Sequence, residues 1–259
     1  MKLIDCSASI GWGGINREIV NHENYFVYEK VDEPADAAEL LAEMDFCGID
    51  KAAVYHQAAM DVSPAYGNAR LQAEVKGQDR LYTIAAWLPP LTDEEFGLSA
   101  LEKELRTGIA GIRLSPQINR FMLDRITCGD LLDFATERKL PVYLSPAYGW
   151  EYIFAALKEF PALTVILTNY GLWGSDRYFW PLLHAYKRVY VDMSDMQELR
   201  GPESFVNRFG SERLLFGTNY PMDNMGGPVA TLIGANLAEE DRENVAHANF
   251  ERLYAEVRR

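Results

Sequence analysis

The sequence is poor in cysteine and histidine and contains no paired metal-binding motif. Three cysteines occur among 259 residues, namely Cys6, Cys47 and Cys128, and none forms part of a CxxC pair. A disulfide framework or a structural zinc site needs clustered or evenly paired cysteines. We therefore exclude both and expect reduced, mostly buried thiols.

Positive charge is also scarce. The chain carries 25 Lys and Arg against 38 Asp and Glu, a formal net charge of −13, and no segment gathers a run of like charges. Nucleic-acid binding and attachment to an anionic membrane both require a basic patch. The sequence therefore predicts neither partner and favours a small-molecule ligand.

Long apolar runs are absent as well. The opening residues MKLIDC have no basic segment followed by a long apolar stretch, and no apolar run approaches the roughly 18 residues of a membrane span. From this pattern we expect a soluble, cytoplasmic protein.

Short β-rich runs alternate with segments of helical period throughout the chain. The predicted strands are Leu3–Cys6, Lys51–Tyr55, Leu81–Ala86, Gly111–Leu114, Pro141–Leu144, Thr164–Leu167, Val189–Asp192 and Leu214–Thr218. The predicted helices lie within 33–48, from Ser63 onward, and at Thr92–Arg106, Leu131–Arg138, Glu151–Phe160, Tyr178–Tyr186, Glu203–Phe209 and Glu239–Val257.

Eight strand–helix units predict a single (β/α)8 TIM barrel over residues 1–259. Runs such as TVILT suit strands that are buried on both faces, as parallel sheets require. The alternative is an open doubly wound sheet, but no GxGxxG or GxxxxGK[ST] motif follows any strand. The long connection over residues 7–36 is expected to be a lid or binding loop.

A barrel places its active site at the carboxyl ends of its strands. The polar residues just beyond the predicted strands are therefore the site candidates. They are Asp5, Cys6, Ser7, Ser9, His56, Gln57, Trp87, Arg113, Ser115, Ser145, Asn169, Tyr170, Asp192, Ser194, Asp195, Asn219 and Asp223.

Nine segments carry a family resemblance along the whole chain. The chain resembles the amidohydrolase-related, metal-dependent hydrolases with a TIM-barrel fold, including the carboxymuconate-semialdehyde decarboxylase and dicarboxylate lactonase relatives. The matching segments are IDCSASIG, DKAAVY, DRLYTIAAWLPP, GIAGIRLSP, LPVYLSPAYG, FPALTVILTNYG, KRVYVDMSD, ERLLFGTNYPM and LAEEDRENVAHANFERLY.

The resemblance fails where the family binds metal. The family's first strand has the pattern I-D-x-H-x-H-x-G, and the later metal-site positions carry two further histidines and an aspartate. This sequence has Ser7, Ser9, Ser145, Asn169 and Asn219 at these positions. Hydroxyls and neutral amides are poor ligands for zinc or manganese. We therefore predict that the protein has no metal cofactor.

The remaining candidates divide by chemistry. His56, Asp195 and Asp223 could transfer protons, although a lone histidine or a solvated loop acid is more often structural. Arg113 suits a carboxylate, either a structural one such as Asp192 or one on a ligand. The five replacement residues, together with Trp87 and Tyr170, are expected to line the substrate pocket.

For the other histidine and aromatic residues the sequence predicts a location in the fold. His22 is expected in the long first loop, whereas His184 and His247 are expected on outer helices. The cluster Tyr178–Trp180 would suit either the core or a homo-oligomer interface. A sizeable organic ligand is expected from the aromatic residues near strand ends, which are Trp12, Tyr25, Phe26, Trp87, Tyr148, Trp150, Tyr170, Trp173 and Tyr220.

Three functions remain open at this point. The first is a metal-free hydrolase or lyase that acts on a small carboxylated or cyclic compound, with Arg113 binding the acid. The second is a pseudoenzyme that binds a ligand without turnover. The third is a metal hydrolase with ligands rebuilt from His22, His56, Asp195 and Asp223.

Overall fold

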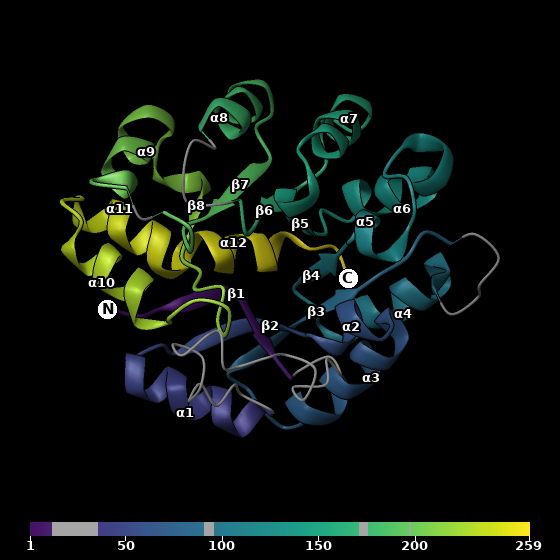
Figure 1. The fold of residues 1–259 in the computed structure, drawn as a ribbon, viewed down its shortest axis with the longest axis horizontal. Coiled ribbons are helices and arrows are strands. Elements are labelled where there is room, and N and C mark those ends of the chain that lie inside the picture. Colours follow the sequence, from purple (N-terminus) through teal and green to yellow (C-terminus); the bar gives the residue numbers. More distant parts are fainter. Residues whose placement is uncertain (12–35, 91–95, 171–175, 197) are drawn as a thin grey trace, which may run out of the picture.

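Eight parallel strands form one sheet in sequence order and curl into a barrel, with helices packed around it (Figure 1). The computed structural model describes residues 1–11, 36–90, 96–170, 176–196 and 198–259. The strands are β1 (Ile4–Ile10), β2 (Lys51–His56), β3 (Leu81–Ala86), β4 (Gly111–Arg113), β5 (Val142–Leu144), β6 (Val165–Leu167), β7 (Val189–Asp192) and β8 (Leu214–Leu215).

The seam between the last strand and the first is closed by individual hydrogen bonds. The Cys6 N–H donates to the Phe216 carbonyl at 2.9 Å, and the Ser9 N–H donates to the Tyr220 carbonyl at 2.8 Å. The sheet therefore has the nearly closed form that the TIM-barrel prediction requires, and the prediction is confirmed.

The helices that follow β1 to β4 are α1 (Ala37–Cys47), α2 (Ala58–Asp61), α3 (Pro64–Val75), α4 (Leu98–Thr107), α5 (Pro116–Asn119) and α6 (Arg125–Glu137). Those that follow β5 to β8 are a 3-10 turn (Pro146–Tyr148), α7 (Glu151–Glu159), α8 (Asp176–Ala185), α9 (Gly201–Phe209), a 3-10 turn (Ser211–Arg213), α10 (Gly226–Gly234), α11 (Glu239–Glu243), a π-helical turn (Asn244–Ala248) and α12 (Asn249–Glu256).

The interior of the barrel is a separate core from the helix layer. Alternate residues of the strands point inward, including Tyr55, Tyr143, Ile166 and Tyr190, while Phe250 and Leu253 of α12 cluster with them. The larger core packs the outer faces of the strands against the helices. In β1 the register with β2 shifts between Asp5 and Ala8, so that the side chains beyond this bulge change face.

The element predictions hold best for the buried strands. The structure confirms eight strands, but β1 runs on to Ile10 and the ladder of β8 ends at Leu215. The first helix ends at Gly48, as predicted, because this glycine adopts φ +73° as a left-handed cap. The last predicted helix is interrupted by the π-helical turn, and α2, α5 and α10 were not predicted.

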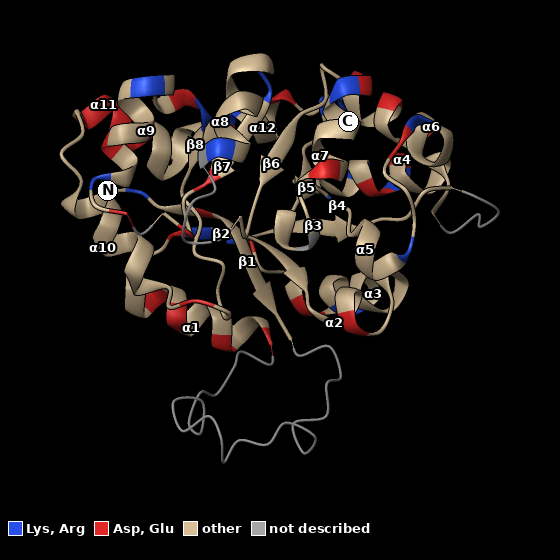
Figure 2. Ribbon diagram, turned by 45° about the horizontal axis from the view of Figure 1, so that its top comes forward, with Lys and Arg blue, Asp and Glu red and all other residues tan. Residues whose placement is uncertain are grey.

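Two further expectations concern the surface and the long loop. Within the described residues, no helix is long and apolar enough to cross a membrane. Figure 2 marks Asp and Glu residues in red along α1 and α11, in keeping with the negative net charge. The predicted lid falls mainly in 12–35, outside the described residues, as do His22 and the aromatic residues Trp12, Tyr25, Phe26 and Trp173.

Gly111 provides a test of packing inside the barrel. A Cβ atom at this position would lie 2.6 Å from the Pro141 carbonyl oxygen and 2.7 Å from the Tyr143 ring. We expect Gly111→Ala to lower the free energy of unfolding by about 1 to 3 kcal/mol, measured by urea denaturation, because the neighbouring strand must move.

Gly227 in α10 is the matched control. A Cβ atom there meets nothing within 4 Å, so Gly227→Ala should leave stability unchanged or raise it by up to about 1 kcal/mol. Equal effects of the two substitutions would contradict the packing argument.

Candidate functional site

Asp192 and Ser7 form the centre of a polar cluster at the carboxyl ends of the strands. The Ser7 hydroxyl, in the irregular part of β1 between Asp5 and Ala8, donates to Asp192 Oδ2. The Ser194 hydroxyl donates to the same oxygen at 3.1 Å, and the Ser194 N–H donates to Oδ1 at 2.8 Å. Gly217 makes this approach possible, because a Cβ atom there would lie 2.6 Å from Asp192 Cγ and 2.7 Å from Ser7 Oγ.

Asp5 lies beside this cluster, and its carboxylate is held by hydrogen bonds from two neighbouring segments of the chain. Its Oδ1 accepts the N–H groups of Ser7 at 2.9 Å and Thr218 at 3.1 Å, while Oδ2 accepts the Thr218 hydroxyl at 2.5 Å. The carboxylate thus bridges β1 to the chain that follows β8, and it leaves little capacity for another ligand.

Both carboxyl groups are completely buried, and burial shifts their acidity. Desolvation raises the pKa of Asp192 to about 7, against the opposing hydrogen bonds from Ser7 and Ser194. Desolvation likewise raises the pKa of Asp5 to about 6, opposed by the bonds from Thr218 and Ser7. A buried carboxyl group that titrates near neutral pH can act as an acid or a base.

Arg113, at the end of β4, is a buried cation. Only 8% of its surface is exposed, its guanidinium carbon lies 4.4 Å from the centre of the Tyr55 ring, and Nη1 donates to Thr168 Oγ1 at 3.4 Å. Within the described part of the chain, Nε is buried without a hydrogen-bond partner and no carboxylate pairs with the guanidinium. Asp192, the structural partner considered for Arg113, is hydrogen-bonded to Ser7 and Ser194 instead.

A small cavity opens beside Arg113 at the ends of β4, β5 and β6. Its volume is about 140 Å³. It has hydroxyl and amide groups as well as apolar walls, and its lining comprises Met60, Arg113, Leu114, Ser115, Pro116, Gln117, Ile118, Ser145, Ala147, Tyr152 and Asn169. Four predicted site candidates are thus brought together here, namely Arg113, Ser115, Ser145 and Asn169.

His56 and Trp87 point away from the interior of the barrel. His56 accepts the Ala58 N–H at Nδ1 at 3.0 Å, so a neutral ring carries its proton on Nε2, which lies 3.5 Å from Glu74 of α3. Burial lowers its pKa, against the opposing effect of Glu74. Trp87 donates from its ring nitrogen to the Phe96 carbonyl at 3.0 Å and packs in the outer core.

The other predicted site residues lie around the mouth of the barrel. The Ser9 hydroxyl donates to the Tyr220 carbonyl at 3.2 Å, and Asn219 donates to Asp223 at 2.6 Å. Asn169 and Asn219 both adopt positive φ, near 51° and 55°, which asparagine tolerates better than most residues. Asp195 and Tyr170 are buried just beyond β7 and β6.

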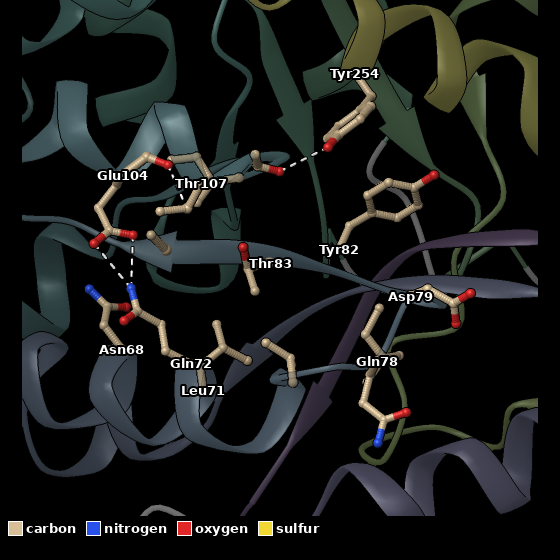
Figure 3. Close-up of a pocket in the computed structure, with 15 residues that line it drawn as sticks. Asn68, Leu71, Gln72, Gln78, Asp79, Tyr82, Thr83, Glu104, Thr107 and Tyr254 are labelled. Atoms are coloured by element: carbon tan, nitrogen blue, oxygen red, sulfur yellow. Dashed lines mark hydrogen bonds between the residues drawn. The ribbon is translucent and has the colours of Figure 1, made fainter. Parts of the chain in front are cut away.

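A second cavity of about 440 Å³ lies outside the barrel, between α3, β3 and α4 (Figure 3). Gln72 and Glu104 face each other across it, with hydrogen bonds of 2.9 and 3.0 Å. It opens onto Tyr82 and Thr83, near the beginning of β3. Because it lies away from the strand ends, we assign the functional site to the smaller cavity beside Arg113.

The eight-stranded barrel with a polar cavity at the strand ends defines a TIM-barrel protein of the kind that supports many enzymes. The family model described as "Amidohydrolase" matches residues 33–255, and the chain belongs to this family. No curated protein sequence matches it significantly.

Solved structures of similar fold include an uncharacterized TIM-barrel protein from Bordetella bronchiseptica, with 21% identity, 99% of both chains covered and a TM-score of 0.76. A 5-carboxyvanillate decarboxylase from Sphingomonas paucimobilis has 16% identity, coverage of 98% and 99%, and a TM-score of 0.68. A dihydroxybenzoic acid decarboxylase from Polaromonas sp. JS666, with bound manganese, has 17% identity, coverage of 98% and 97%, and a TM-score of 0.73.

The residues at the family's metal positions do not fit a divalent ion. The Ser7 hydroxyl donates to Asp192, and the Asn219 amide donates to Asp223. Ser9 accepts from Gln57 at 2.9 Å as well as donating to a carbonyl. Among the described residues, no group of three or more His, Cys, Asp or Glu side chains could hold a metal ion. Hydroxyls and neutral amides supply none of the imidazole and carboxylate ligands that zinc or manganese prefers.

Two site residues were missed or placed in another role by the sequence analysis. Asp192 was named among the polar residues at the strand ends, but its one specific role was as a partner for Arg113. Tyr152, whose hydroxyl donates to the Ser145 carbonyl, was not considered at all. The position of Asp192 at the end of a strand was visible in the sequence. Its hydrogen bond from Ser7 depends on the closure of the barrel, which no local pattern shows.

Asp192→Asn should change the pH dependence of stability. Because the pKa in the folded state, about 7, exceeds the ordinary value of 3.8, the folded protein binds the proton more tightly than the unfolded chain does. Stability from this group is present at low pH and is lost as the pH rises through about 7. Between pH 5 and pH 8, we expect the free energy of unfolding to fall by about 1 to 4 kcal/mol more in the wild type than in Asp192→Asn.

Urea denaturation at the two pH values measures the effect. The exposed Asp130, changed to Asn, serves as the control and should follow the wild type. A wild-type decline that persists unchanged in Asp192→Asn would rule out Asp192 as its source.

Proposed function

We propose that this amidohydrolase-family protein is a lyase that decarboxylates a small carboxylated substrate and does so without a metal ion at the family's usual positions. The buried Arg113 is the observation that carries the proposal, since no carboxylate of the described chain pairs with it. A buried guanidinium without an anion is costly, and a ligand carboxylate would satisfy it through two hydrogen bonds.

The cavity supports a small substrate. A volume of about 140 Å³ accepts a compact acid, and the hydroxyls of Ser115 and Ser145 can hydrogen-bond to its polar substituents. Met60 and Ile118 supply apolar wall area for a ring. Neighbours of the same fold act on carboxyvanillate and dihydroxybenzoic acid, which agrees with a carboxylated aromatic substrate.

The chemistry of the site favours decarboxylation over hydrolysis. Hydrolysis in this family depends on hydroxide generated at a metal ion, and the serine and asparagine side chains at the metal positions do not fit one. Decarboxylation requires a carboxylate to be oriented and a carbon atom to be protonated. Arg113 supplies the first requirement, and a buried acid near neutral pKa can supply the second.

Arg113→Ala should weaken the binding of carboxylates. The probes are 2,6-dihydroxybenzoate and 5-carboxyvanillate, with affinity measured by isothermal titration calorimetry and turnover by release of carbon dioxide. We expect wild-type binding and turnover of at least one probe, and a loss of about 10- to 100-fold in affinity in the variant.

Exposed Arg106, changed to Ala, is the matched control and should bind as the wild type does. Unchanged affinity in Arg113→Ala would remove the role assigned to Arg113. Binding without turnover of any probe would instead favour the pseudoenzyme interpretation.

Metal analysis tests the second part of the proposal. Elemental analysis of protein purified without chelator should find no stoichiometric zinc or manganese, and titration with either ion should leave the melting temperature unchanged. Stoichiometric metal together with a stabilising titration would contradict it and support a metal site built from other ligands.

A further inference from the structure

Ser115 is the residue of the Arg113 cavity whose hydroxyl has the weakest hydrogen-bond partner. It lines the cavity together with Met60 of α2. Its Oγ donates to Met60 Sδ at 3.1 Å, and the side chain has no other hydrogen bond within the described part of the chain. A thioether sulfur is a weak acceptor. The proton of the Ser115 hydroxyl is therefore available to a stronger acceptor that enters the cavity.

The two other hydroxyl groups of the cavity lining donate to backbone oxygens. The Tyr152 hydroxyl donates to the Ser145 carbonyl, and the Ser145 hydroxyl donates to the Asn169 carbonyl at 3.4 Å. A carbonyl oxygen is a stronger acceptor than a thioether sulfur. Of the three hydroxyl groups in the lining, Ser115 is thus the one whose proton is redirected to a ligand at the least cost.

Arg113 and Ser115 lie on the same face of the chain at different depths. The chain between them stays extended, since the Leu114 N–H donates to the Tyr143 carbonyl at 3.2 Å, and the Leu114 side chain packs in the outer core. Alternate residues of an extended chain point to the same face and lie about 6.6 Å apart along it. The strand runs toward the mouth of the barrel, and accordingly Arg113 is buried whereas Ser115 is half-buried. Arg113 therefore lies deeper in the cavity than Ser115.

The Arg113 guanidinium is held on the inner side of the cavity. Its carbon lies 4.4 Å from the centre of the Tyr55 ring, which belongs to the core inside the barrel, and Nη1 donates to Thr168 Oγ1. Nε is buried and has no hydrogen-bond partner among the described residues. The donors with capacity for a ligand thus lie apart, a charged one toward the interior and a neutral one toward the mouth. A compact acid that binds with its carboxylate inward places its opposite end beside Ser115.

We propose that Ser115 selects the substrate by donating a hydrogen bond to an oxygen acceptor at the end of the molecule opposite its carboxylate. The substrate class is then a compact carboxylic acid with an ether or carbonyl oxygen at that far end, rather than an acid whose polar substituent adjoins the carboxylate. This inference rests on the proposed function, since that function places the carboxylate at Arg113. It adds which end of the substrate the protein distinguishes, and by which residue.

Met60 makes the selection depend on an oxygen atom. Because its sulfur satisfies the Ser115 hydroxyl only weakly, little is lost when that proton turns to an oxygen of the ligand. A ligand with an apolar group at the same end leaves the bond between Ser115 and Met60 unbroken, and gains only packing against Met60 and Ile118. The cavity therefore distinguishes an ether oxygen from a methylene group of similar size.

The experiment measures the binding of matched benzoates by isothermal titration calorimetry. 4-Methoxybenzoate carries an ether oxygen opposite the carboxylate, and 4-ethylbenzoate carries a methylene group in its place. We expect the wild type to bind 4-methoxybenzoate about 3- to 10-fold more tightly than 4-ethylbenzoate. In 2-methoxybenzoate the oxygen adjoins the carboxylate, so this acid should bind no more tightly than 2-ethylbenzoate.

Three variants separate the Ser115 hydroxyl from the shape of the cavity. Ser115→Ala should abolish the preference for 4-methoxybenzoate while changing the affinity for 4-ethylbenzoate by no more than about 2-fold. Met60→Leu removes the competing sulfur at nearly constant volume, so the preference should remain or increase. The exposed Ser204, changed to Ala, is the matched control and should bind both acids as the wild type does. If Ser115→Ala fails to fold by circular dichroism, the ligand pairs on the wild type and on Met60→Leu carry the test.

The outcomes distinguish this inference from the proposed function. Equal affinity of the wild type for the two 4-substituted acids, or a preference that Ser115→Ala retains, would overturn the role of Ser115 and leave the role of Arg113 intact. Arg113→Ala that binds these acids as tightly as the wild type would overturn both. A preference that depends on Ser115, in a protein that releases no carbon dioxide from any probe, would support this inference and overturn decarboxylation alone.

Discussion

The fold depends on closing a sheet whose last strand is very short. The ladder of β8 contains two residues, so the seam with β1 relies on the backbone bond from Cys6 to Phe216 and on the Asp5 carboxylate. Asp5 holds Ser7 on one side and Thr218 on the other. These bonds fix the backbone at Ser7 within β1. The same hydrogen bonds therefore close the barrel and position the Ser7 side chain in the polar centre.

The polar centre at the strand ends is a network of hydrogen bonds. Ser7 and Asn219 stand where the family resemblance places metal ligands. The Ser7 hydroxyl donates a hydrogen bond to Asp192, and the Asn219 amide donates one to Asp223. The interior remains hydrophilic, yet its charge is held by Asp192 and Arg113 on different strands.

Much of this architecture could be predicted because it depends on local chemistry. Val165–Leu167 and the first three residues of Val189–Asp192 are rich in apolar and β-branched side chains, so they form strands that are buried on both faces. Gly48 ends a helix because it accepts positive φ. His56 shows the limit of the method. It follows Tyr55, which points into the barrel, and a shift of one residue in a strand turns the side chain toward the helices.

The sequence by itself determined the barrel and its strand order, since both follow from residue type and period along the chain. The family resemblance added that Ser7, Ser9, Ser145, Asn169 and Asn219 stand where metal ligands are expected. Only the tertiary structure decided that Arg113 has no carboxylate partner in the described chain and that Asp192 is bonded to Ser7 instead. Those facts depend on the register between strands that are far apart in sequence. That register decides which side chains come within hydrogen-bond distance, and no local sequence pattern determines the register.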